Sequence, residues 1–181
     1  MTRALAVLAA LLVAACSQEA AQSCPGEPVA SFAFSGAFSG GALAAGLDPD
    51  PALTDCDPAV GFPRGGPTKP ALSFRGTLSA DATGSGGALC RADGPILFGT
   101  HAGVRWRVEE GADGAVLGGC GPTCAARSHV VITGDVTPNT TDPTAFTGAL
   151  VEQLFFADGA CGPCVLPCAA RYALDATLEA P

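Results

Sequence analysis

Cysteine is the main reactive side chain in this sequence, and four of its nine cysteines form two closely spaced pairs. Two residues separate Cys161 from Cys164, and three residues separate Cys120 from Cys124. Cysteines at such spacings can exchange a disulfide, bind a zinc ion as thiolates or form structural bridges. The compartment of the protein and the elements around the cysteines decide among these three kinds of chemistry.

The tetrapeptide Cys161-Gly162-Pro163-Cys164 resembles the active site of thioredoxin-like oxidoreductases. The resemblance implies thiol–disulfide exchange by a cysteine at the N-terminus of a long helix, within a βαβ framework. Only 181 − 164 = 17 residues follow Cys164, and their pattern is typical of one strand. Cys168 also has no part in such a mechanism. Thiol–disulfide exchange by Cys161 and Cys164 is therefore an alternative, and we expect a protein that is not an enzyme.

Two sets of residues could bind a metal ion. The first is the thiolate set for zinc, made of Cys120, Cys124, Cys161 and Cys164. The second is a set of carboxylates for calcium in the loop 46–70, made of Asp48, Asp50, Asp55 and Asp57. This loop lacks the spacing of an EF-hand, and Asp-Pro pairs are ordinary turn residues. Since an exported chain favours disulfides, no metal or other cofactor is expected, and calcium or zinc binding stays an alternative.

Hydrolytic chemistry has little support in the sequence. The two histidines, His101 and His129, lie in a Gly-rich turn and in a strand pattern, and no Gly-x-Ser-x-Gly motif accompanies them. Trp106 stands between Arg105 and Arg107. This alternation favours a core tryptophan with exposed arginines over a platform for stacking a ligand.

The first 15 residues are typical of a secretory signal peptide, with Arg3 ahead of the apolar run 4–15. The run is too short to span a bilayer, which needs about 20 residues. Its end, Val13-Ala14-Ala15-Cys16, resembles the lipobox of bacterial lipoproteins. The resemblance implies cleavage before Cys16, a diacylglyceryl thioether on its sulfur and a fatty-acyl chain such as palmitate on the new N-terminus. Ser17, in place of aspartate, implies sorting to the outer membrane.

If Cys16 carries lipid, eight cysteines remain, and an even number in an exported domain predicts a disulfide framework. These cysteines are Cys24, Cys56, Cys90, Cys120, Cys124, Cys161, Cys164 and Cys168.

The elements that must position these cysteines are predicted to be strands. Frequent Gly and Pro residues, 24 and 15 in number, make long helices implausible. Alternating apolar residues predict strands over 32–38, 72–78, 104–108, 130–136, 146–150 and 172–178. Apolar-x-Gly-x-apolar recurs within four of these strands, and such glycines often mark bends or close backbone approach. We expect an all-β, disulfide-stapled antiparallel sandwich or small barrel.

Two segments are similar to one another and indicate a duplicated strand–loop–strand unit. ADGAVLGGCGPTCAAR at 112–127 matches ADGACGPCVLPCAAR at 157–171. If the two loops are equivalent, their local bridges would be Cys120–Cys124 and Cys161–Cys168. Longer ties would then be left for Cys24, Cys56, Cys90 and Cys164.

These observations predict a signal peptide at 1–15, a lipid-anchored tether at 16–28 and a cysteine-rich β domain at 29–181. Without residues 1–15 the net charge is 8 − 17 = −9, so nucleic acid is not an expected partner. We expect an outer-membrane protein that faces the periplasm or the cell surface. Its role would be non-catalytic binding or structure in the cell envelope. The membrane would be contacted through lipid on Cys16, and an envelope protein or glycan is the possible partner.

Overall fold

The computed structural model describes residues 23–39, 43–56, 71–117, 120–162 and 164–179. The signal peptide, Cys16, most of the tether and Asp57 lie outside the described residues. The described residues form eight strands and contain no helix long and apolar enough to cross a membrane. The strands are β1 (Glu27–Phe38), β2 (Ala71–Ala80), β3 (Gly86–Arg91), β4 (Ile96–Ala102), β5 (Arg105–Val116), β6 (Ala125–Thr137), β7 (Ala145–Asp158) and β8 (Cys168–Leu178).

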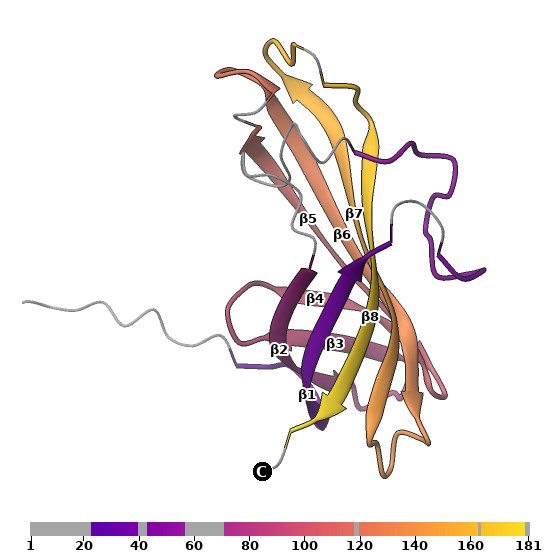
Figure 1. Cartoon of the computed structure of the whole chain (residues 1–181). Coiled ribbons are helices and arrows are strands. Elements are labelled where there is room, and N and C mark those ends of the chain that lie inside the picture. Colours follow the sequence, from indigo (N-terminus) through magenta and orange to yellow (C-terminus); the bar gives the residue numbers. More distant parts are fainter. Residues whose placement is uncertain (1–22, 40–42, 57–70, 118–119, 163, 180–181) are drawn as a thin grey trace, which may run out of the picture.

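The strands close into one barrel in chain order (Figure 1). Each strand pairs antiparallel with the next, and β8 pairs antiparallel with β1 from Phe32↔Leu178 to Phe38↔Tyr172. The all-β, disulfide-stapled fold is confirmed, and of the two architectures expected it is the barrel. Within the closed part of the barrel, each strand has hydrogen-bonding partners on both sides.

Alternation along the strands decides what fills the barrel. In β5, Trp106 and Val108 are buried, whereas Arg105 and Arg107 between and beside them are exposed. Tryptophan at position 106 is therefore a core residue, 1% exposed. The other large, fully buried apolar side chains include Phe32, Leu78, Leu89, Leu97, Ile132, Phe146 and Leu174.

The repeated glycines make room for these large side chains. A Cβ atom at Gly36 would lie 2.8 Å from side-chain carbons of both Leu72 and Leu174, and one at Gly76 would lie 2.8 Å from Leu89. Gly148 is the tightest of the set, because its Cβ would lie 2.2 Å from the carbonyl oxygen of Thr133, a backbone atom on the neighbouring strand. The pattern thus marks positions where the barrel wall or its contents approach the backbone closely.

Replacing Gly148 with alanine is expected to lower the free energy of unfolding by about 1–3 kcal/mol, because β6 and β7 must move apart to admit one methyl group. Gly111, on β5, is the matched control, since its Cβ would meet only the oxygen of Ser128, at 3.9 Å. Gly111→Ala should change the stability by less than about 1 kcal/mol, in either direction. Denaturant unfolding of both oxidised variants measures this. Equal effects at the two positions would contradict the close approach.

The barrel is uneven in height, because β3 and β4 are short. β4 pairs with β5 only from Phe98↔Glu109 to Ala102↔Arg105, so the rest of β5 continues with β6 alone. The hairpins β5–β6 and β7–β8 consequently extend beyond the closed part of the barrel (Figure 1). Both copies of the repeated segment lie at the tips of these hairpins.

Candidate functional site

The two hairpin tips are joined by two disulfides, Cys120–Cys164 and Cys124–Cys161. The local pairing expected from the repeat is therefore wrong. β6 and β7 are paired along their whole length, from Thr137↔Ala145 to Ala125↔Asp158, which places the two tips side by side. Each of these four cysteines forms its disulfide with a cysteine of the other hairpin tip, not with one in its own loop. We call the described part of this doubly bridged region, residues 117, 120–124, 156–162 and 164–167, the tip clasp.

Backbone contacts between the tips accompany the bridges. Gly159 has φ 83°, and its Cβ would lie 1.8 Å from the carbonyl oxygen of Thr123. The N–H of Ala160 donates to Oγ1 of Thr123 over 3.3 Å. Only glycine fits at position 159, for reasons of both conformation and space.

The tip clasp combines a buried base with an apolar surface. Cys120 and Cys124 are 3% and 0% exposed, and they belong to the same core cluster as Leu117. Two apolar side chains nevertheless point outward, Phe156 at 56% and Val165 at 75% exposure. The disulfides therefore hold two exposed apolar side chains on a cross-linked support.

The geometry of the tips differs from that of a thioredoxin-like site. Cys161 and Cys164 are bonded to the other tip and not to each other, and the described residues after Cys164 lead into β8 rather than a helix. The four cysteines proposed for zinc do meet in space, but their sulfurs form disulfides, which are not thiolate ligands. Among the residues that the structure describes, no group of three or more His, Cys, Asp or Glu is placed to hold a metal ion.

The acidic loop is bound by an arginine. Nε of Arg171 donates to Oδ2 of Asp48 over 2.5 Å, and its Nη1 donates to Oδ1 of Asp55 over 2.7 Å. Its Nη2 donates to the carbonyl oxygens of Asp50 and Leu53 over 3.1 and 2.9 Å. Burial alone would lower the pKa of Arg171, but hydrogen bonds and attraction to Asp48 and Asp55 outweigh burial and raise it. Two of the four carboxylates considered for calcium, those of Asp48 and Asp55, thus have a guanidinium partner.

The same loop replaces β1 where that strand ends. The part of β8 before Tyr172 has no partner in β1, and residues of the loop lie along this edge instead. The N–H of Cys56 donates to the oxygen of Ala169 over 2.9 Å, and the N–H of Ala169 donates to the oxygen of Thr54 over 2.9 Å. The disulfide Cys56–Cys168 closes this contact.

The sequence alone does not single out Arg171 as a structural residue. Its counterpart in the repeat, Arg127, is exposed and pairs with Asp113 at the surface, over 2.7 Å. Two features of the sequence could have indicated this role. The loop 46–70 is rich in aspartate and needs a cation, and an arginine stands at the repeated position, 171. The sequence also does not indicate the surroundings of Tyr172. Its burial, and next the charge of Glu152, raise the pKa of its hydroxyl.

Each histidine contacts side chains of its own sheet. His101 lies in β4, not in a turn, and stacks on Trp106 with ring centroids 4.5 Å apart. His129 on β6 forms a 3.0 Å hydrogen bond between Nδ1 and Oε1 of Gln153. Its Nε2 lies 3.7 Å from Oε2 of Glu109. Both rings thus have structural neighbours on their own sheet.

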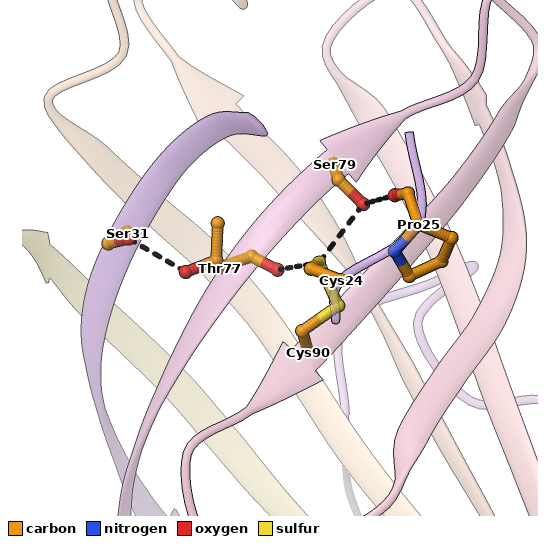
Figure 2. Close-up of a disulfide and its surroundings, with 6 residues drawn as sticks. All are labelled: Cys24, Pro25, Ser31, Thr77, Ser79 and Cys90. Carbon is orange, nitrogen blue, oxygen red and sulfur yellow. Dashed lines mark hydrogen bonds between the residues drawn. A yellow bond between two sulfur atoms is a disulfide. The ribbon is translucent and has the colours of Figure 1, made fainter. Parts of the chain in front are cut away.

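The fourth disulfide, Cys24–Cys90, fastens the start of the described chain to the outer face of β3 (Figure 2). Sγ of Cys24 lies 3.3 Å from Oγ of Ser79, and this hydroxyl donates to the carbonyl oxygen of Pro25 over 2.5 Å. Ser79 is 1% exposed beneath this short segment. We call residues 24–26 the N-terminal strap.

With the four bridges assigned, the eight non-lipobox cysteines are all paired in the structure. No protein-family model matches the chain, and comparisons with curated proteins and with solved structures give no significant match.

Proposed function

We propose that this chain is a lipid-anchored protein of the bacterial cell envelope with a non-catalytic binding role, and that the tip clasp is its binding surface. The observation that carries the proposal is the set of four disulfides, spanning sequence separations of 37 to 112 residues. Such a framework suits an oxidising compartment. Together with the signal sequence and lipobox pattern ending at Cys16, it favours export and anchoring, with the outer membrane as the destination.

A binding role is favoured over thiol–disulfide exchange by the arrangement of the tips. Exchange by the Cys-Gly-Pro-Cys segment requires a reactive pair, whereas Cys161 and Cys164 each brace a different bridge between the hairpins. Rigid presentation of Phe156 and Val165 reduces the entropy lost when a partner binds. An envelope protein or a glycan remains the expected partner class.

Anchoring is tested by following the precursor in cells. Globomycin, which blocks lipoprotein signal peptidase, should cause the precursor to accumulate, and Cys16→Ser should abolish labelling by radioactive palmitate. Normal processing under the drug would refute the lipid anchor.

Binding at the tips is tested separately with a photo-cross-linking phenylalanine analogue in place of Val165. The matched control carries the analogue in place of Val104, which is 38% exposed in the turn between β4 and β5. A discrete adduct at position 165 that is missing at position 104 supports the proposal. Equal labelling at both positions, or none at position 165, counts against the tip clasp.

A further inference from the structure

One side of the barrel carries few charged side chains. The outward-facing side chains of β3 and β4, and those of β2 after Arg75, are uncharged. We call them the neutral face: Thr77, Ser79, Ala88, Cys90, Ile96, Phe98, Thr100 and Ala102. Of these, Ser79, Ala88 and Ile96 are buried. On the adjoining strand β5 the outward residues are Arg105, Arg107 and Glu109, all charged. The neutral face can therefore approach an apolar or interfacial phase while the exposed carboxylate of Asp81, at its edge, stays in water.

An apolar feature lies at the centre of the neutral face. Phe98 is 56% exposed on β4. Beside it lies a groove of about 200 Å³ between the strap and the strands. Its lining includes Pro25, Gly26, Ser79, Asp81 and Ala88, together with glycines of β3 and β4. Asp81, at the rim, is the ionisable residue of this lining, and its carboxylate accepts a hydrogen bond from the hydroxyl of Thr83. Most of the lining is small or apolar, which suits contact with lipid.

The N-terminal strap fixes the chain that follows the proposed lipid anchor to the side of the barrel that carries the neutral face. Without the Cys24–Cys90 disulfide, the tether would leave the barrel at the beginning of β1, Glu27. With it, the chain is fixed to β3 three residues earlier (Figure 2). The adjoining residues Pro25 and Gly26 line the groove. Seven residues lie between Cys16 and Cys24, which makes 24 − 16 = 8 steps along the chain, so the span from lipid to strap is at most about 28 Å.

We propose that the neutral face lies against the membrane surface, with Phe98 inserted at the level of the headgroups; this rests on the proposed lipid anchor at Cys16. Aromatic and aliphatic side chains bind the boundary between headgroups and acyl chains. One such residue binds weakly by itself, but a short tether gives an effective concentration in the millimolar range. The remaining surface of this acidic domain is repelled by anionic headgroups, which favours the neutral orientation.

The proposed orientation also separates the tip clasp from the surface that contacts the membrane. The tips lie at the far end of β5–β8, beyond the closed part of the barrel, whereas the strap lies on the side of β2 and β3 (Figure 1). Phe156 and Val165 belong to this end of the molecule and not to the neutral face. The membrane and a second partner would therefore contact different surfaces.

The test uses tryptophan fluorescence in vesicles whose phosphatidylcholine carries brominated acyl chains, which quench nearby indoles. Phe98→Trp is compared with Phe156→Trp, since both phenylalanines are 56% exposed. The native Trp106 is buried, and its signal is subtracted using the wild-type protein. In the lipidated full-length protein, we expect a loss of emission for Phe98→Trp and unchanged emission for Phe156→Trp. Equal quenching of both, or none at position 98, would overturn the orientation.

A second arm separates this inference from the anchor. The same two variants, beginning at Ser17 with a histidine tag, are bound to vesicles of the same composition that contain a nickel-chelating lipid. Selective quenching of Phe98→Trp there supports the orientation even if Cys16 proves not to be lipidated. Failure of the full-length protein to float with vesicles rejects the anchor, and absence of selective quenching in the tagged variants rejects the neutral face.

Discussion

Replacing Arg171 with methionine is expected to lower the free energy of unfolding by about 3 kcal/mol, because two carboxylates and two carbonyl groups lose their shared donor. Arg171 is 1% exposed, and methionine fills much of its space without replacing its charge. The side chain of Asp48 is only 11% exposed, so its charge would remain poorly solvated. Asp55, at 40%, can turn to water, which limits the loss.

The matched control for Arg171 is its counterpart in the repeat. The ion pair Arg127–Asp113 has side chains 64% and 81% exposed, and exposed pairs contribute under about 1 kcal/mol. Arg127→Met should therefore leave the denaturant midpoint nearly unchanged, whereas Arg171→Met lowers it and speeds proteolysis within residues 43–56. Similar midpoints for the two variants would show that the arginine does not hold the loop.

Removal of the Cys56–Cys168 bridge, by alanine at both positions, is expected to cost about 4 kcal/mol through the entropy of the unfolded chain. The two cysteines are 112 residues apart, but the remaining bridge Cys120–Cys164 shortens the path between them. The loop that the bridge closes then has (120 − 56) + (168 − 164) = 68 residues. The native loop also loses a covalent hold at its end, beside the hydrogen bonds to Ala169.

The control for this bridge is Cys124–Cys161, a disulfide that closes a much shorter loop. With Cys120–Cys164 intact, Cys124–Cys161 closes a loop of only (124 − 120) + (164 − 161) = 7 residues. Its removal by alanine at both positions should cost about 2 kcal/mol. Unfolding is followed by the fluorescence of Trp106, with mass spectrometry to verify the other three bridges. A larger loss for the tip bridge would contradict the loop-entropy argument.

Local patterns predicted the strands, because alternation depends only on neighbouring residues and on the period of a pleated chain. The runs around Phe34, Phe74, Trp106 and Phe146 all became strands with these residues turned toward the interior. The glycine pattern predicted bent strands with close contacts, and the contacts at Gly148 bear out the close approach. The choice between sandwich and barrel was left open, since it depends on whether the last strand pairs with the first.

Cysteine pairing shows where local reasoning stops. The two similar segments do lie at the tips of two similar hairpins. The bridges predicted within each loop from this similarity were wrong. Whether Cys120 meets Cys124 or Cys164 depends on the register of β6 and β7, which brings two distant tips together. The same limit applies to Arg171 and Arg127, which have matching neighbours in sequence and opposite surroundings in space.

The sequence by itself determined the kinds of groups present: an alternating pattern for strands, an even set of cysteines for bridges, and a lipobox pattern at Cys16. Only the tertiary structure decided which cysteines pair, which arginine is buried and which face of the barrel lies beside the tether. The physical reason is that alternation is a property of consecutive residues, whereas each bridge and buried ion pair joins segments tens of residues apart. Their meeting depends on the order and register in which the whole barrel closes.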